Sequence, residues 1–183
     1  EHSISGEIGA DGSIYIRALA ANPDAQDSLN CNIAIADELH AYKTPKQYTI
    51  IKDAMKAYTN KLMIGITTAG DSVNSYCYRR LKYCQKVLDG TVKAEELFIF
   101  ICKADESPNG DVDYTSPVVH EMANPGYGIT IRPADIMADA VQAQNDPQTR
   151  KEFFNKSLNI YTSVMKAYFD IGEFIASDSR HKW

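Results

Sequence analysis

The chain has 183 residues, which is long enough to bury one sizeable core. Its 44% hydrophobic and 23% charged residues are typical of a globular domain. A formal net charge of -5 argues against a polybasic protein whose whole surface attracts nucleic acid, although a local basic patch is compatible with it. No segment is apolar for long enough to span a bilayer, no secretion signal opens the chain, and the four cysteines form no CxxC pair. We therefore expect a soluble protein of a reduced cytoplasm.

The first predicted elements are two strands. A turn signal at 10–12 precedes Ser13–Leu19, whose apolar and β-branched residues predict a strand that a following Asn-Pro pair interrupts. The short apolar run Asn32–Ala36 ends directly in two acidic residues. This is the pattern of a buried parallel strand that carries acids at its carboxyl end.

The middle of the chain alternates between helices and strands. A Thr-Pro-Lys-Gln tetrapeptide at 44–47 predicts a helix start, because it combines a capping box with proline at the first helical position. A second buried strand is expected over 61–68, a helix from 71 or 72 to 88, and a third buried strand over 97–102. Strands that alternate with helices through short connections indicate an α/β domain with a parallel sheet.

The last third of the chain is predicted to be helical after a long loop. Residues 105–127 are polar and interrupted by Pro and Gly, which favours an exposed loop. Two helices follow, Pro133–Asn145 and one from Pro147 to about Phe169. Asp146 is the expected N-cap of the second, with proline at its first position.

Asp37 and Glu38 carry the sharpest chemical signal. An apolar strand delivers both carboxylates to the crevice where parallel sheets place their ligands. In nucleotide hydrolysis the first acid can hold Mg²⁺, usually through its waters, while the second orients or deprotonates the attacking water. Taken alone, the pair is a weak signal and is better explained by solvated acids at a strand end.

Four blocks in order resemble the terminase large subunit family of tailed phages, the motor that drives DNA into viral capsids. They cover most of residues 13–160 and are Asp37–Thr44 after an apolar strand, Ile66–Gly70 at the end of the next strand, the Ala-Asn-Pro-x-x-Gly segment Ala123–Gly128, and the Phe-x-x-Lys-x-Leu-Asn run from Phe153 to Asn159. The resemblance implies a P-loop NTPase-like, mostly parallel sheet flanked by helices. It also implies a division into the C-terminal part of an ATPase core (1–130) and a helical lid or linker (131–183).

The resemblance assigns roles to four residues. Asp37 would bind magnesium, Glu38 would act on the attacking water, and both would contact the Mg²⁺-ATP cofactor; Thr67 and Thr68 would sense the nucleotide. Hydroxyls at the carboxyl end of a strand can indeed bond the water or the γ-phosphate. The alternative for the two threonines is a loop pair that caps the helix expected near Asp71.

The sequence also departs from the family pattern. A phosphate-binding loop needs G-x-x-x-x-G-K-[ST], and no Gly here is followed by Lys. Since the chain also starts at Glu1 and ends before the expected nuclease acids, we expect a fragment of the ATPase domain that lacks both parts. The resemblance would place the strand before the missing loop between the strands at 61–68 and 97–102. We expect these two to pair directly, with another chain or the N-terminal segment as the alternative neighbour.

The implied function is ATP hydrolysis coupled to translocation of viral DNA into the procapsid. The partners would be double-stranded DNA, the terminase small subunit, the portal protein and further copies of the chain, in the cytoplasm of the bacterial host. One rival is a helicase-like or other DNA-remodelling ATPase, since Asp-Glu after an apolar strand serves these equally. Another is a non-catalytic prophage remnant that acts as an interaction domain.

The remaining polar candidates are interpreted as structural. His40 and His120 each stand near a glutamate, but no second pair with zinc-like spacing accompanies them. Arg17 and the pair Arg79-Arg80 are read as solvated charge, and so are the acids within 105–113.

Overall fold

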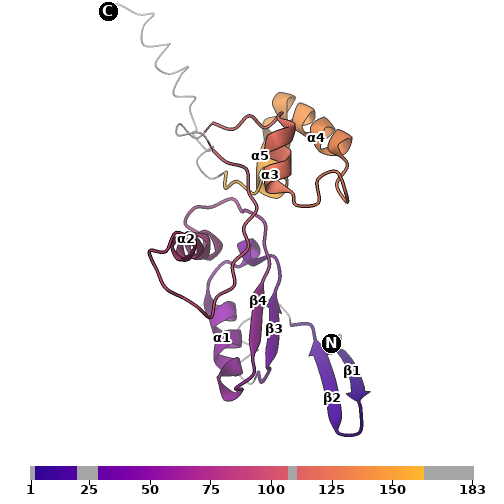
Figure 1. Ribbon diagram of the computed structural model, residues 1–183, viewed down its shortest axis with the longest axis vertical. Helices are drawn as coiled ribbons and strands as arrows, with labels where there is room; N and C mark the ends of the chain where they lie inside the picture. Colours follow the sequence, from indigo (N-terminus) through magenta and orange to yellow (C-terminus); the bar gives the residue numbers. More distant parts are fainter. Residues whose placement is uncertain (1–2, 20–28, 107–110, 163–183) are drawn as a thin grey trace, which may run out of the picture. The chain divides into compact units, whose positions relative to one another are not determined.

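The computed structural model describes residues 3–19, 29–106 and 111–162 (Figure 1). They belong to two compact units, one of Glu1–Ala36 with Thr44–Ile64 and one of Asp37–Lys43 with Gly65–Trp183. The first unit contains strands β1 (Ser3–Ile8), β2 (Gly12–Arg17), β3 (Ile33–Ala36) and most of β4 (Leu62–Gly65), helix α1 (Lys46–Ala54) and the 3₁₀ turn η3 (Met55–Ala57). The second contains the 3₁₀ turn η2 (Leu39–Ala41) and helices α2 (Tyr76–Leu88), α3 (Pro117–Ala123), α4 (Pro133–Asn145) and α5 (Pro147–Lys156).

Strands β1 and β2 form an antiparallel hairpin in which Ile4 faces Ile16 and Gly6 faces Ile14. The strand predicted over Ser13–Leu19 is confirmed as β2, slightly shorter than expected. Its partner β1 was missed, because its two isoleucines are separated by serine, glycine and glutamate, which weakens the strand pattern.

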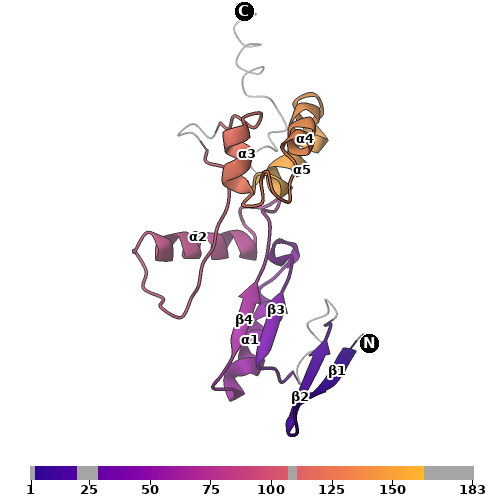
Figure 2. The ribbon, with the colours of Figure 1, turned by 45° about the vertical axis from the view of Figure 1, so that its right-hand side comes forward.

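Strands β3 and β4 and the intervening helix α1 form a β-α-β unit (Figure 2). The amide of Leu62, at the start of β4, donates to the carbonyl of Asn32, just before β3, at 2.9 Å. Since the two starts are neighbours, the strands run parallel. Ile51 and Met55 are buried, and in both views α1 lies beside the strand pair. The strand-helix-strand prediction is confirmed for this part of the chain.

The predicted burial of these strands is wrong for the residues that the structure describes. Side chains alternate along β3, so Ala36 is buried while Ile33 and Ile35 are exposed, and Leu62 and Ile64 of β4 are exposed as well. A sheet of two strands with one neighbouring helix has a single covered face. The apolar runs indicated strands correctly but could not tell one covered face from two.

The prediction of a third strand over Leu97–Cys102 is also wrong. Within the described ranges the segment joins no ladder, and β4 pairs only with β3, so the expected direct pairing is absent. Phe98 and Phe100 are 89% and 72% exposed. The end of the segment is instead bound to the turn after α5: Ala104 donates to the carbonyl of Leu158, and the Asn159 side chain donates to that of Cys102, both at 2.9 Å. The α/β class therefore holds, but the described sheets have two strands each and form no broad parallel sheet.

Helix α2 begins at Tyr76 and is capped by Ser75, whose Oγ accepts from the amide of Tyr78 at 3.1 Å. The predicted start at Asp71 or Ser72 is therefore wrong by several residues. Asp71 could have capped a helix equally well by sequence, but its carboxylate is bound elsewhere, to Lys151 and Asn155.

Helices α3, α4 and α5 surround the main apolar core of the second unit. Its centre includes Ile136, Phe153 and Leu158, with Tyr114 and Tyr127 packed against it. Helix α4 has the predicted bounds, and α5 starts as predicted, with Asp146 accepting from the amide of Gln148. Helix α3 lies inside the expected loop, where Pro117 at its start suggested a loop rather than a helix.

Helix α5 ends at Lys156, well before the predicted end at about Phe169. The last part of the predicted helix, 163–169, lies outside the described residues. Soon after the end of α5, Asn159 takes a left-handed backbone conformation with φ 54°, which asparagine tolerates better than most residues. The Asn124 side chain donates to the carbonyls of His120 and Ser157, both at 2.8 Å, and so joins α3 to the end of α5. Two asparagines of the family-like segments thus have structural roles.

Leu158 has no exposed surface and lies at the centre of this core. Leu158→Ala should therefore lower the free energy of unfolding of the helical part by about 2–5 kcal/mol, through lost burial and the cavity left behind. The half-exposed Val141 of α4 provides the control, and Val141→Ala should change it by less than about 1 kcal/mol. Denaturant titration followed by circular dichroism measures both; equal effects would contradict the proposed core.

Candidate functional site

The two loops that carry the predicted site residues are joined by a backbone hydrogen bond. One loop follows β3 and contains Asp37, Glu38 and the turn η2; the other follows β4 and contains Thr67 and Thr68. The amide of Leu39 donates to the carbonyl of Ile66 at 3.1 Å. This contact brings together residues that are nearly thirty positions apart in the sequence.

Glu38 adopts a left-handed backbone conformation with φ 50° and ψ 49°. Such a conformation costs a non-glycine residue on the order of 1–2 kcal/mol, and residues of this kind gather at functional sites. Two hydrogen bonds hold it: the Glu38 amide donates to Oδ1 of Asp37 at 2.9 Å, and the Glu38 carbonyl accepts from Ala41 at 2.8 Å. The backbone thus fixes Glu38 while its side chain stays 63% exposed.

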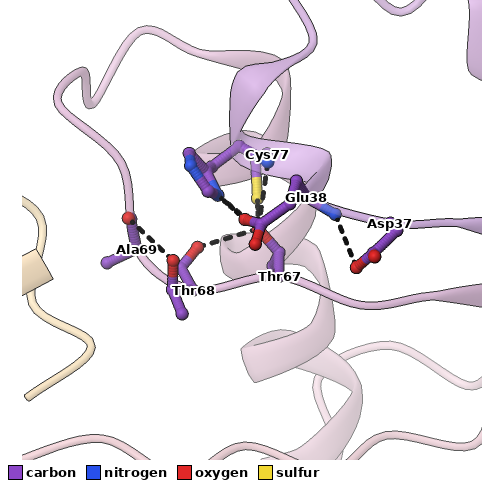
Figure 3. Close-up of polar contacts among 7 residues, drawn as sticks. Asp37, Glu38, Thr67, Thr68, Ala69 and Cys77 are labelled. Carbon is purple, nitrogen blue, oxygen red and sulfur yellow. Dashed lines mark hydrogen bonds and ion pairs between the residues drawn. The ribbon is translucent and has the colours of Figure 1, made fainter. Parts of the chain in front are cut away.

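The hydroxyl of Thr67 takes part in several of the hydrogen bonds of the site (Figure 3). It donates to the carbonyl of Thr68 at 2.8 Å and accepts from the amide of His40 at 2.9 Å. The thiol of the buried Cys77, on α2, points at the same oxygen from 3.7 Å. One side chain therefore connects the turn after β3, the loop after β4 and the first turn of α2.

His40 lies within this network. Its Nδ1 is 3.1 Å from Oε2 of Glu38 and 3.2 Å from Oγ1 of Thr67. Nδ1 is the donor in this contact in the tautomer that carries its proton there, because a carboxylate accepts. The structure thus adds to the site a histidine that the sequence interpretation left aside; the signal was its place two residues after Glu38 in a tight turn.

Thr68 faces a cavity of about 230 Å³ that is also lined by residues of α5. Its hydroxyl contacts the carbonyl of Ala69 at 3.5 Å. The alternative in which Thr67 and Thr68 cap the following helix is wrong, because α2 starts at Tyr76 with Ser75 as its cap. Neither threonine hydroxyl is occupied by helix capping.

The oxygen donors of the site suit magnesium held together with a nucleotide. In the described part of the chain, no group of three or more His, Cys, Asp or Glu side chains could hold a metal by itself. Mg²⁺ is usually bound by one or two carboxylates, with phosphates and water as the other ligands. Asp37 can be such a carboxylate. Its charge also acts on a neighbouring phenol: the pKa of Tyr42 is raised, mainly by burial and further by Asp37.

The other polar candidates lie elsewhere. His120 is fully buried, with Nε2 2.8 Å from the carbonyl of Tyr114, which confirms its structural interpretation. Arg79 donates to the carbonyl of Asn74 at 2.6 Å, and the guanidinium of Arg80 lies 5.2 Å from the ring centre of Tyr83. Arg17 ends β2 in the first unit. No helix among the described residues is long and apolar enough to cross a membrane.

Comparisons with known proteins agree with these features. Residues 6–86 match the family model for the ATPase domain of the terminase large subunit. Protein YmfN of Escherichia coli (strain K12) is 32% identical over 180 residues, covering 92% of this chain and 38% of that protein. The crystal structure of the HK97 bacteriophage large terminase matches with a TM-score of 0.62 at 22% identity, over 73% of this chain and 26% of that one.

Residues 6–86 are thus similar to the ATPase domain of the terminase large subunit, and the HK97 match shows that the fold is shared. The resemblance drawn from the sequence is confirmed at this level. The matched segment includes Asp37, Glu38, Thr67 and Thr68. The chain spans well under half the length of both relatives.

Proposed function

We propose that this chain is part of the ATP-hydrolysing motor of a phage terminase large subunit, which translocates viral DNA into the procapsid. The observation that carries the proposal is the joined pair of loops within the family-matched segment. In them the Glu38 carboxylate and the Thr67 hydroxyl both contact Nδ1 of His40, and Asp37 accepts from the amide of Glu38. Acids and a hydroxyl are the kinds of group that orient a hydrolytic water and contact a phosphate, which supports the proposal.

Glu38 is proposed to orient or deprotonate the attacking water. Its carboxylate is exposed, and its backbone is fixed in a conformation that an ordinary strand end does not require. Nδ1 of His40 lies within hydrogen-bond distance of both this carboxylate and Thr67, so the position of the carboxylate depends on the loop after β4. The water-activating group and the expected nucleotide sensor are therefore mechanically linked.

Asp37 is proposed to hold magnesium, together with the phosphates of ATP. The bound ion would supply positive charge to the transferring phosphoryl group. Asp37 Oδ1 also accepts from the Glu38 amide, so the metal-binding acid and the catalytic acid support each other through one short turn. Thr67 and Thr68 are proposed to sense the γ-phosphate, since both lie just beyond the carboxyl end of β4, at the start of the loop that follows it.

The phosphates of ATP would also need a cradle from outside this sequence, which has no G-x-x-x-x-G-K-[ST] motif. We propose that residues 1–130 are the C-terminal part of the ATPase core and 131–183 a helical lid or linker. Double-stranded DNA, the terminase small subunit, the portal protein and further copies of the chain are the proposed partners. Loss of γ-phosphate contacts would then move the loop and pull on bound DNA.

A helicase-like ATPase would use the same acids, but the family match at 6–86 favours the terminase. A non-catalytic prophage remnant would keep this fold without the phosphate-binding loop. The genomic sequence upstream distinguishes the packaging motor from the remnant: an intact loop motif supports the motor, and its absence supports the remnant.

Glu38→Gln in the full-length protein should lower ATP turnover on the order of a hundredfold or more, because the amide cannot take a proton from the water. ATP binding should persist, since the carboxylate serves the water and not the nucleotide. Steady-state hydrolysis and equilibrium nucleotide binding measure the two effects. Glu95→Gln, at an exposed position away from the site, is the control. Turnover near the wild-type rate in Glu38→Gln would refute the assignment.

Asp37→Ala should weaken the magnesium dependence of nucleotide binding, because the ion loses its protein carboxylate. Titration of magnesium at fixed ATP gives the apparent affinity for the ion. Asp139→Ala, on the exposed side of α4, should leave this affinity as in the wild type. An unchanged magnesium affinity in Asp37→Ala would count against the metal-binding role.

The isolated 183-residue chain should hydrolyse no ATP and bind it poorly. Without the amides and lysine of a phosphate-binding loop, the β- and γ-phosphates have no partners to replace their hydration. Isothermal titration calorimetry with Mg²⁺-ATP tests this directly. A dissociation constant in the micromolar range would show that the chain provides another phosphate site.

A further inference from the structure

Asp71, three residues after Thr68, is bound through both carboxylate oxygens to helix α5. Lys151 Nζ lies 2.7 Å from Oδ2, and the Asn155 side-chain amide donates to Oδ1 at 2.5 Å. Lys151 and Asn155 are four residues apart and so share one face of the helix. We refer to Asp71, Lys151, Asn155 and Thr162 as the Asp71 clasp.

The orientation of the Asn155 amide is set by a further buried contact. Thr162 donates to Oδ1 of Asn155 at 3.0 Å, and Asn155 and Thr162 are only 8% and 3% exposed. With its oxygen used by Thr162, the amide turns its NH₂ group to Asp71. The clasp is therefore a directed chain of contacts from the loop after β4, through α5, to the segment that follows α5.

The link between Thr68 and Asp71 is short and tightly packed. A Cβ atom at Gly70 would lie 3.1 Å from Cβ of His40 and 3.6 Å from the ring of Tyr161, and Ala69 is buried. Such packing leaves little room for Thr68 to move without moving Asp71. A displacement of the threonines by nucleotide would consequently strain or release the hold of Asp71 on Lys151 and Asn155.

We propose that the Asp71 clasp couples the nucleotide-sensing loop to helix α5, and that the effect of DNA on ATP turnover passes through it. The inference rests on the proposed function and deepens it, by naming the contacts that join the site to the helical part of the chain. Two arrangements are involved: the clasp closed as observed, and open when the loop moves. Ligands at either end bias this equilibrium.

The test is ATP turnover of the full-length protein with and without double-stranded DNA. Asp71→Asn keeps the size of the side chain and one oxygen for Asn155, and replaces the charged oxygen that holds Lys151 with an uncharged NH₂ group; Lys151→Met removes the other half of the ion pair. In both variants we expect basal turnover close to that of the wild type and a DNA-induced change in turnover reduced at least about fivefold.

Lys156→Met is the matched control. Lys156 lies on the same helix and lines the same cavity, but its ion pair, with Glu152 at 3.9 Å, stays within α5. DNA affinity, measured in parallel, separates coupling from DNA binding: Asp71→Asn makes the surface less negative, so weaker binding cannot explain a loss of DNA response. If Asp71→Asn does not fold, Lys151→Met against Lys156→Met decides the test.

A wild-type DNA response in either folded clasp variant would overturn the inference while leaving the proposed function in place. An equal loss in Lys156→Met would overturn it too, because the effect would then belong to the helix surface in general. The inference would also be overturned if DNA did not change the ATP turnover of the wild-type protein. Complete absence of ATP turnover in the wild-type full-length protein would instead refute the proposed function itself.

Discussion

The candidate site depends on the hydroxyl of Thr67. A threonine hydroxyl has one proton and two lone pairs, and here the proton is given to the carbonyl of Thr68 while the oxygen accepts from the amide of His40. The hydrogen bond from the Leu39 amide to the Ile66 carbonyl joins the same two loops. Because both contacts cross between loops, neither loop can shift alone without leaving a polar group without its partner.

The same constraint explains why Glu38 can occupy a left-handed conformation. The cost of that backbone geometry is offset by local bonds, from the Glu38 amide to Asp37 and from Ala41 to the Glu38 carbonyl. His40 then restrains the exposed carboxylate. Geometry at the acids thus arises from a few hydrogen bonds within a tight turn and does not require deep burial of the strand that precedes them.

The sequence predicted elements best where local signals agreed and no distant partner was needed. Helix α4 starts at a proline and keeps its apolar spacing, and Asp146 with Pro147 marked the start of α5. Leu97–Cys102 shows the limit, because an apolar run favours strand conformation but does not supply a neighbour with which to pair. His40 was missed for a similar reason: its place two residues after Glu38 was a weak local signal, and its other partner, Thr67, is 27 positions away.

The contacts of this chain separate two requirements of a nucleotide-hydrolysing site. The acids, the threonines and His40 are arranged by bonds among loops 37–43 and 65–71, all within one compact unit. Binding of triphosphate instead requires several amides and a lysine that converge on the phosphates, which this sequence does not encode in a G-K motif. The arrangement of acids and hydroxyls proposed for hydrolysis therefore does not depend on a phosphate-binding loop, since its preorganisation requires only local backbone order. For the same reason, a well-formed arrangement of Asp37 and Glu38 supports a role in hydrolysis but is no measure of nucleotide affinity.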